Sequence, residues 1–492
     1  MVHSTQRIRA VDGGWRTPST LAFYALIPVG FALRVAFAGS AAYRLDSDSV
    51  IVYLMARRVS EGEIAAFFWG QSYGGTLLQS SAGLVMAVLG DDEMVLVVVS
   101  VLYWLGAAVL LRLIVLRSVN RRAGDVAGAL MWFPGAAILG TSVIDPGFYG
   151  PSLVVGLGAL WIVTRWWRAM TVPLWLAVGA LCGLALWTSP MAVALATPAL
   201  VAAMWSDRRW RLWLLAAAVA LVAALPWLIE TVRSSLGSVR PLGEDRRIHW
   251  ESFASLFTTM FPASFPLGDQ ELPQFFIALA LVASIAGVIV QGVRTRTVGA
   301  VLIGAATILL ILVLVLGSGV RLAADSARYS AFMIPVAAFA IAWLVARMRW
   351  PATGVMAAAP TVTLLLVLSG TNGLAPSVAG RYDGNFAAIR EVLAQRDITA
   401  GYGAYWMAYP FTASVDEQFT LASLVPRRYA PYEEAASRQS RTAMVVYLDH
   451  ENDRMLSTHV GLPEYERIVV GGYAVYVFES RLDPYILPLG LF

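Results

Sequence analysis

The sequence has no lysine, one cysteine and few charged residues for its length. All 36 residues counted as Lys or Arg are therefore arginines. The single cysteine, Cys182, excludes an intramolecular disulfide and any metal site built on several cysteines. Charged residues make up 14% of the chain, against roughly 25% in soluble proteins. An ordinary soluble domain is therefore excluded.

Histidine is scarce as well, since His3, His249, His450 and His459 are the only four. They lie too far apart in sequence to show the spacing of metal ligands, so a divalent metal is neither indicated nor ruled out. The sequence shows no nucleotide-binding motif, and nucleic acid is not an expected partner. It also shows no internal repeat, which disfavours the transporters that are built from inverted repeats.

Hydrophobic residues make up 58% of the chain, and its mean hydropathy is +0.66. A bilayer core of roughly 30 Å is crossed by about 20 apolar residues in a helix. On this template the sequence predicts an α-helical polytopic protein in a lipid bilayer, with about eleven spans. The expected spans are 21–39, 94–116, 124–144, 150–166, 173–188, 190–205, 212–230, 273–291, 298–317, 330–346 and 352–369.

Arginines gather in every second loop, which indicates the orientation of the spans. The basic loops contain Arg7, Arg9 and Arg16, then Arg117, Arg121 and Arg122, then Arg165 and Arg168, then Arg208, Arg209 and Arg211, then Arg294 and Arg296, and last Arg347 and Arg349. We expect these loops in the cytoplasm of a bacterial cell and the chain in its plasma membrane. The N-terminus is then cytoplasmic, and segment 21–39 is expected to remain as a signal anchor.

Residues 40–93 are expected to form one long outer loop with two interfacial helices. Run 77–89 is too short to span, and counting it as a span would place all later arginine clusters outside. In the other helix, 47–59, Val50, Leu54 and Val59 could face lipid while Arg57 and Arg58 stay in water. Arg34, inside the first span, could reach outward to the headgroups and then needs no functional role.

No further span follows residue 370, and we divide the chain into a membrane domain, 1–370, and an outer domain, 371–492. Apolar periodicity predicts a helix over 385–396 and strands over 443–448 and 468–478. The C-terminal part is therefore expected to be a small extracytoplasmic α/β domain. Tyr402, Tyr405, Trp406 and Tyr409 lie close together there, and an aromatic core explains them better than a carbohydrate platform.

Three aspartates at the outer ends of spans are candidates for catalysis: Asp46, Asp48 and Asp145. An ionised carboxylate is costly near hydrocarbon and marks a site where charge is used. Each has a structural alternative. Asp46 could cap the helix that begins near Ser47, and Asp145 could cap a helix at its Pro-Gly turn. Asp48 lies inside the start of that first helix, where Ser47 is available as a cap.

Arginines on the same side could bind a phosphate. Arg328 stands with Tyr329 at the start of the tenth span, and Arg246 and Arg247 lie in the outer loop 231–272. The two loop arginines have acidic neighbours and could equally be solvated surface charges. A carboxylate base and cations that hold a phosphate leaving group suit a group-transfer reaction.

The motifs at these positions resemble the GT-C superfamily of polyprenyl-phosphate-sugar-dependent glycosyltransferases, in the branch with protein O-mannosyltransferases and lipid A aminoarabinose transferases. The resemblance covers most of residues 20–350. Ser49 replaces the usual Glu, and glycines stand where prolines are common. The residues that carry the resemblance are Asp48-Ser49, Tyr53, Ala56-Arg57, the segment from Gly74 to Gly90-Asp91-Asp92-Glu93, Asp145, and Ala327-Arg328-Tyr329 with Pro335.

The resemblance implies a GT-C type fold and an inverting transfer of a sugar from a polyprenyl-phosphate donor to a cell-envelope acceptor. Asp48 would be the general base, with Asp46 or Asp145 assisting. Arg328, Arg246 and Arg247 would neutralise the departing phosphate. Two other classes stay open: a transporter or flippase of lipid-linked or amphipathic solutes, with the acidic loop as an ion site, and a scaffold whose outer domain binds partners. A transporter is expected to keep ionisable residues at mid-membrane depth, whereas in this sequence they gather at the outer ends of the spans.

The topology can be tested by cysteine-accessibility labelling in a Cys182→Ser background. Because the arginine loops set the orientation, we expect an impermeant thiol reagent to label cysteines placed near Asp46, Asp145, Arg246 and residue 400, and to miss those near Arg121 and Arg208. Labelling at position 145 from the cytoplasmic side only would overturn the topology and the proposed site together.

Overall fold

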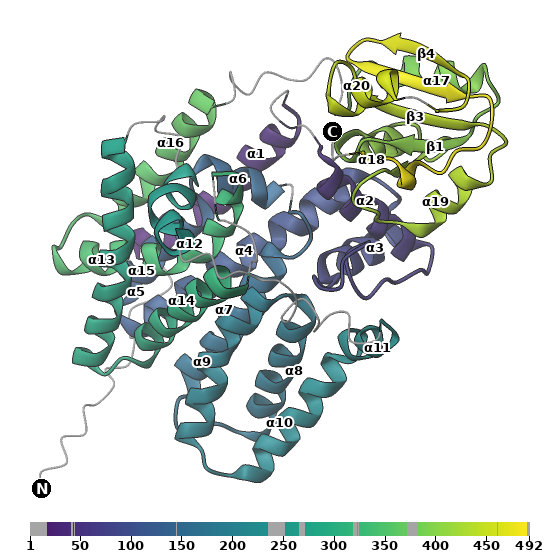
Figure 1. Ribbon diagram of the computed structural model, residues 1–492. Helices are drawn as coiled ribbons and strands as arrows, with labels where there is room; N and C mark the ends of the chain where they lie inside the picture. The colour runs from purple at the N-terminus through teal and green to yellow at the C-terminus, as the bar shows by residue number, and fades with distance from the viewer. Residues whose placement is uncertain are drawn as a thin grey trace, which may run out of the picture.

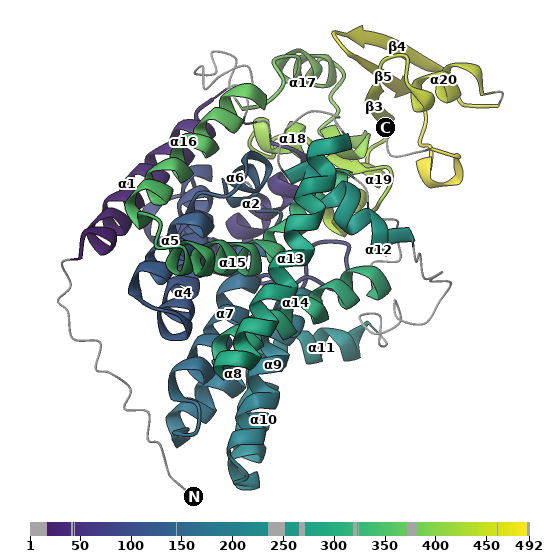
Figure 2. The same ribbon diagram turned by 90° about the vertical axis from the view of Figure 1, so that its left-hand side faces the viewer.

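The protein consists of a large helical body and a small α/β unit that sits at one end of it (Figure 1). The structure is a computed structural model, and it describes residues 17–40, 43, 45–143, 145–234, 251–264, 271–317, 322, 324–370, 381–459 and 461–489. Turning the molecule by 90° shows the same division, with the sheet at the end of the chain lying apart from the helical body (Figure 2). The α-helical polytopic architecture with a C-terminal α/β unit is thereby confirmed.

The helical body contains all the segments expected to span the membrane. Its elements are α1 (Pro18–Ala38), α4 (Glu93–Ser118), α5 (Arg121–Trp132), α6 (Ala136–Val143), α7 (Tyr149–Trp166), α8 (Val172–Thr188), α9 (Pro190–Ser206), α10 (Trp210–Ala223), α11 (Leu225–Arg233), α12 (Glu251–Ser255), η2 (Leu256–Met260), η3 (Pro262–Ser264), α13 (Glu271–Thr295), α14 (Val298–Gly317), η4 (Ala324–Met333), α15 (Ile334–Arg347) and α16 (Ala352–Gly370). Among the described residues, five helices are long and apolar enough to cross a membrane, or six if the bent pair α10–α11 counts as one span. The number of eleven spans stays a prediction.

Two of the expected spans are broken rather than continuous. Span 124–144 is two helices, α5 and α6, because Pro134 follows the end of α5 and cannot continue its hydrogen-bond ladder. Span 212–230 is α10 and α11, which meet at an angle of 61° just before Pro226. The predicted apolar runs pass over both breaks, because hydrophobic residues occur on each side of them.

Arg34 points into the helical body and does not reach the headgroups, so this expectation is wrong. Its guanidinium is fully buried and donates to Ser142 Oγ at 2.7 Å, to the Trp132 carbonyl at 2.9 Å and to the Gly30 carbonyl at 3.1 Å. It also lies 4.0 Å from the centroid of the Trp132 ring. Because α5 ends at Trp132, the carbonyl of this residue is free to accept a hydrogen bond from Arg34. The hydrogen bonds inside the protein therefore replace those that Arg34 would make with water and headgroups.

A second buried charge joins α1, α4 and α5. Asp125 is fully buried and forms an ion pair of 2.8 Å with Arg112. The other carboxylate oxygen accepts hydrogen bonds from the hydroxyls of Ser19, at 2.8 Å, and Thr20, at 2.9 Å. Both charges are thus compensated inside the helical body, as buried ions require.

The segment predicted as the long outer loop forms two helices, α2 (Ser47–Ser60) and α3 (Leu77–Leu89), close to the predicted ranges. The predicted surroundings of α2 are wrong, because Val50, Leu54 and Val59 are buried in protein rather than facing lipid. The C-terminal unit packs on α2 through its helix α18. Amphipathic spacing marks an apolar face but does not tell whether lipid or protein covers it.

The C-terminal unit is built on a five-stranded sheet with the order β2-β1-β3-β5-β4. Strand β1 pairs in parallel with β2 and β3, and β5 pairs antiparallel with β3 and β4. The elements are α17 (Phe386–Ala394), β1 (Ala400–Gly403), α18 (Tyr405–Ser414), β2 (Thr420–Ser423), α19 (Ala430–Ser437), β3 (Thr442–Tyr447), α20 (Glu451–Thr458), β4 (Tyr465–Val470), β5 (Tyr473–Phe478) and η5 (Pro484–Ile486). The single strand expected over 468–478 is a hairpin, since Gly471 and Gly472 form a two-residue turn.

Helices α2 and α3 share one hydrophobic core with the C-terminal unit. Side chains of α2 and α3, such as Leu54 and Leu78, belong to the same buried cluster as Phe411 of α18 and Val475 of β5. A separate cluster fills the helical body. The division of the chain into two domains at residue 371 stays a prediction. Packing joins residues 47–86 to the part of the chain that follows residue 381.

Ion pairs reinforce this contact. Arg57 on α2 lies 2.9 Å from Asp91 and 2.6 Å from Asp416 of the C-terminal unit. The neighbouring Arg58 pairs with Glu417 and, at 2.7 Å, with Glu61. The two arginines in the last turn of α2 are therefore paired with acidic residues that come from the α2–α4 segment and from the C-terminal unit.

The buried pair Arg112–Asp125 gives a testable prediction about stability. Asp125→Leu should lower the free energy of unfolding by about 3–5 kcal/mol, because it leaves the Arg112 charge buried without a partner. The double variant Arg112→Met with Asp125→Leu should recover most of that loss. Thermal unfolding in detergent measures both variants, and a double variant less stable than Asp125→Leu alone would contradict this account.

Candidate active site

Asp48 lies where the helical body, α2 and the C-terminal unit meet. It stands in the first turn of α2, and its side chain is mostly buried but still 16% exposed. Its Oδ1 accepts a hydrogen bond from the Tyr405 hydroxyl, and its Oδ2 lies 3.5 Å from Nη1 of Arg328. Residues from three distant parts of the chain thus converge on one carboxylate.

Tyr405 comes from the first position of α18, and its hydroxyl bridges Asp48 and a second cation. Nη2 of Arg428 donates to the Tyr405 oxygen at 3.3 Å. Burial and the nearby Asp48 carboxylate raise the pKa of Tyr405, so its hydroxyl stays protonated and donates. The backbone carbonyl of Tyr405 accepts a hydrogen bond from Ser47, which ties α18 to the start of α2.

Arg328 approaches Asp48 from η4, the 3₁₀ segment that precedes α15. Its Nε is buried without a hydrogen-bond partner, and its guanidinium carbon lies 5.8 Å from the centroid of the Tyr329 ring. Nε of Arg428 is likewise buried and unpaired. Two guanidiniums therefore lie within one hydrogen-bond network around Asp48 and keep donors unused, as a site for an anion would.

Asp46 is the N-cap of α2. Its Oδ1 accepts hydrogen bonds from the backbone N–H of Ser49 at 2.9 Å and from the Ser49 hydroxyl at 2.6 Å. In return, the backbone N–H of Asp46 donates to the Ser49 hydroxyl oxygen at 3.1 Å. This reciprocal capping box fixes the start of the helix and thereby the direction of Asp48. The structural role weighed for Asp46 is thus present.

Asp145 is buried and caps the N-terminus of α7. Its carboxylate accepts backbone N–H bonds from Gly147 and Tyr149, both at 3.0 Å, and from Gly150 at 2.6 Å. Burial raises the pKa of Asp145 to about 6, and the backbone N–H groups oppose that rise. The ring of Tyr149, which follows this cap, lies 5.7 Å from the Tyr329 ring beside Arg328. Asp145 thus supports the site through Tyr149, with its own oxygens occupied by the cap.

A cavity of about 420 Å³ opens beside Arg428. Its lining comes from the strap of residues 64–71 between α2 and α3 and from α11, with Ile229, Glu230 and Arg233. Gly70 has a φ of +68°, and a Cβ there would lie 2.4 Å from the Arg427 carbonyl oxygen. A glycine at position 70 therefore lets the strap lie directly against the segment that carries Arg428.

The remaining predicted site residues, Arg246 and Arg247, lie outside the described residues, as does His249. In the part of the chain that the structure describes, no three His, Cys, Asp or Glu side chains are arranged to hold a metal ion.

Sequence reasoning missed Tyr405 and Arg428 as site residues. The aromatic group around Tyr405 was expected to be a core, and Tyr402, Tyr405 and Tyr409 are indeed buried. One hydroxyl from that core nevertheless reaches Asp48. Arg428 follows the pair Pro426-Arg427 in a loop, and no local pattern distinguishes it from other surface arginines.

Comparison with known proteins identifies the fold. The sequence matches no family model and no curated protein sequence. The structure resembles ArnT from Cupriavidus metallidurans, an aminoarabinose transferase, in the apo state, with a TM-score of 0.58 and 14% identity over 93% of this chain and 98% of that one. The same protein bound to undecaprenyl phosphate matches with a TM-score of 0.58 and 13% identity over 93% and 97%.

A second similar structure is the archaeal oligosaccharyltransferase AglB from Archaeoglobus fulgidus, in complex with an inhibitory peptide and a dolichol-phosphate. It matches with a TM-score of 0.52 and 11% identity over 94% of this chain and 76% of that one. Both similar proteins are GT-C glycosyltransferases. The chain therefore has the fold of the GT-C glycosyltransferases, as its motifs suggested.

Proposed function

We propose that the protein transfers a sugar from a polyprenyl-phosphate donor to a cell-envelope acceptor at the outer face of the plasma membrane. The observation that carries the proposal is the placement of Asp48 between the Tyr405 hydroxyl and the Arg328 guanidinium. A partly exposed carboxylate beside a cation with an unused donor suits a base that acts next to an anionic leaving group. The GT-C fold supports the same reaction class.

In the proposed mechanism, Asp48 removes the proton from an acceptor hydroxyl as that oxygen attacks the anomeric carbon of the donor sugar. The bond between the anomeric carbon and the phosphate oxygen breaks, and its electron pair leaves with the phosphate. The proton remains on Asp48. A single displacement of this kind inverts the anomeric configuration.

The arginines would stabilise the departing phosphate. Arg328 is the first candidate because it lies next to Asp48 and holds an unpaired buried Nε. Arg428 is a second candidate, because it reaches the Tyr405 hydroxyl and also holds an unpaired buried Nε. Arg246 and Arg247 remain further candidates. Tyr405 is a positioning residue, since its hydrogen bond fixes one oxygen of Asp48 and leaves the other oxygen toward Arg328.

A transporter needs ionisable groups that are free to bind a solute or ion within the helical body. Of the buried charges described there, Arg34 is held by three hydrogen bonds and Arg112 is paired with Asp125. These groups serve packing, so the transporter remains the weaker alternative.

Asp48→Asn tests the base. The change keeps size and most hydrogen bonding but removes the proton acceptor, so the transfer rate should fall by about 10²- to 10⁴-fold. The assay is steady-state transfer from a polyprenyl-phosphate-linked sugar, with thermal unfolding as a check on folding. Asp46→Asn is the matched control, because Asn is an equally good N-cap and should keep most activity. Loss of activity in Asp46→Asn with normal turnover in Asp48→Asn would move the base two residues upstream.

Arg328→Lys tests the phosphate ligand. Lysine keeps the charge but loses the paired N–H groups, so the KM for the donor should rise with acceptor held saturating, and Arg328→Ala should raise it further. Arg347→Lys, at the far end of α15, is the control and should leave the KM unchanged. An effect on the acceptor KM alone, or no effect, would remove Arg328 from the site and leave Arg428, Arg246 and Arg247.

A further inference from the structure

Helix α18 is followed by two acidic residues, Asp416 and Glu417, whose backbones are left-handed, with φ of +52° and +56°. The N–H of Asp416, the first residue after the C-cap, donates to the Ala413 carbonyl at 3.0 Å. The N–H of Glu417 donates to the Thr412 carbonyl at 2.9 Å, which completes a Schellman motif. Glycine is the usual first residue after such a C-cap, because this conformation is unfavourable for a residue with a Cβ. Side chains at these positions therefore require a reason outside the helix.

The two carboxylates of this acidic turn both reach the last turn of α2. Oδ1 of Asp416 lies 2.6 Å from Nη1 of Arg57. The Glu417 carboxylate is only 13% exposed, pairs with Arg58 and lies 3.6 Å from Nη1 of Arg57. It also accepts a hydrogen bond of 2.7 Å from the hydroxyl of Tyr432 in α19. The contact with the end of α2 is thus made by the two residues that hold the unfavourable conformation.

The pair formed by α2 and α18 is held by polar contacts at both ends. At the start, Tyr405 in the first position of α18 binds Asp48 in the first turn of α2. At the end, the acidic turn binds the arginines of α2, so the two helices run in the same direction. A rise of 1.5 Å per residue separates Asp48 from Arg58 by about 15 Å and Tyr405 from Ser414 by about 14 Å. The two spans match, and both contacts form together.

The position of the Tyr405 hydroxyl depends on how α18 lies along α2. Hydrophobic contact is non-directional, so apolar packing with a polar contact at one end leaves a helix free to pivot or slide. A shift of about 1 Å takes a hydroxyl out of hydrogen-bond range of a carboxylate. A second, charged contact at the far end removes that freedom.

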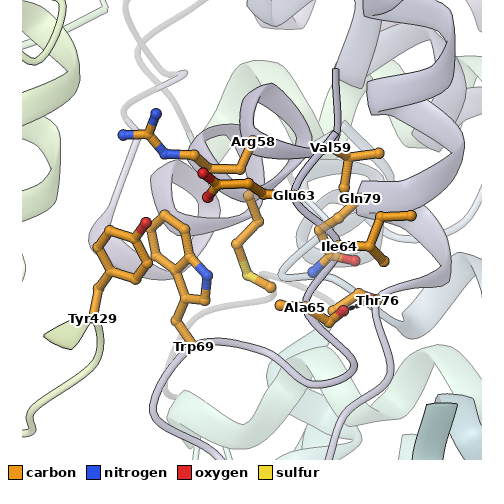
Figure 3. A pocket seen from close by; sticks show the side chains of 10 residues that line it. Arg58, Val59, Glu63, Ile64, Ala65, Trp69, Thr76, Gln79 and Tyr429 are labelled. Carbon is orange, nitrogen blue, oxygen red and sulfur yellow. Dashed lines mark hydrogen bonds between the residues drawn. The ribbon is translucent and has the colours of Figure 1, made fainter. Parts of the chain in front are cut away.

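The end of α2 also lies beside the segment that carries Arg428. Figure 3 shows Arg58 near the ring of Tyr429, which follows Arg428 in the chain and stacks on Trp69 with the ring centroids 3.8 Å apart. These side chains line a second cavity, of about 290 Å³. The last turn of α2 therefore contacts both segments of the C-terminal unit that supply side chains to the Asp48 network.

We propose that Asp416 and Glu417 are positioning residues for the reaction at Asp48. By binding the arginines at the end of α2 they fix where α18 lies, and so hold the Tyr405 hydroxyl at the carboxylate. Neither residue touches the reacting atoms. The inference rests on the proposed function, since a fixed direction of Asp48 matters to a base that must meet an acceptor hydroxyl.

Asp416→Gly separates this role from a stabilising one. Glycine is favoured at the left-handed position, and the ion pair that it removes is weak because the Asp416 side chain is 71% exposed. The melting temperature should therefore stay or rise. The kcat for transfer should nevertheless fall about tenfold, with the KM for the donor unchanged, because α18 is held less firmly. A residue that only stabilises the fold would change the melting temperature and the kcat together.

A double-mutant cycle tests the path from the acidic turn to the base. Glu417→Gln removes the charge that binds the arginines, and Tyr405→Phe removes the hydroxyl that binds Asp48. If the turn acts through that hydroxyl, Glu417→Gln should lower the kcat in the native background and not further in Tyr405→Phe. Glu466→Gln, which breaks the 2.7 Å ion pair with Arg396 elsewhere in the C-terminal unit, is the matched control and should leave the kcat unchanged. Equal losses in both backgrounds would overturn the proposal.

A reporter at position 405 gives a readout without activity. 3-Fluorotyrosine in place of Tyr405 is followed by ¹⁹F NMR in the full-length protein in detergent, and Asp48→Ala marks the resonance of a hydroxyl without its carboxylate. We expect Asp416→Gly and Glu417→Gln to move the resonance toward that position, and Glu466→Gln to leave it unchanged.

An unchanged ¹⁹F resonance in both acidic-turn variants would overturn the positioning role. A shifted resonance, in a protein that transfers no sugar from a polyprenyl-phosphate donor, would support the placement of the hydroxyl by the acidic turn and contradict the proposed reaction instead. The two failures are therefore distinguishable.

Discussion

The burial of α2 under the C-terminal unit is the contact on which the rest of the site depends. A helix that lay free on a membrane would leave Asp48 in water with nothing to direct it. Here α18 covers the apolar side of α2, Ser47 binds the Tyr405 backbone, and the Tyr405 hydroxyl binds Asp48. The same contact brings Arg428 and Tyr429 beside the strap, where they border the two cavities. One packed interface thus sets the direction of the carboxylate and the shape of its surroundings.

Charge is used differently on the two sides of this interface. Inside the helical body, the buried Arg34 donates to groups on α1, α5 and α6, and Arg112 is paired with Asp125, so these charges hold helices together. Around Asp48, Arg328 and Arg428 keep nitrogen atoms without partners although these atoms are buried. Desolvated donors of this kind are a cost to the folded protein and an advantage to an anion that binds them. This contrast separates structural ions from candidate functional ones more clearly than their positions in sequence do.

Sequence reasoning predicted the parts of the fold that depend on local patterns. The positions of most helices followed from the apolar runs, and runs too short to span a bilayer predicted α2 and α3. The motif around Asp48 indicated the fold class. The predictions failed where protein, rather than lipid or water, covers a side chain. Val50 and Leu54 were predicted to face lipid and Arg34 to reach the headgroups, but all three are buried in protein. Asp48 and Arg328 were predicted as site residues and do meet, whereas Tyr405 and Arg428 were missed. Contacts between residues more than 350 positions apart leave no periodicity to find.

The shared core also sets the order in which the molecule can be completed. A ribosome releases α2 and α3 early in synthesis, and the helical body follows, but α18 and Arg428 emerge near the end of the chain. Until then α2 packs on α3 but lacks the cover of α18, and Asp48 lacks Tyr405. Because chains fold from the N-terminus as they are made, the site forms only when the last segment folds. A protein truncated after α16 would lack Tyr405 and Arg428, so the Asp48 carboxylate would lose both the hydroxyl that binds it and the guanidinium beside that hydroxyl.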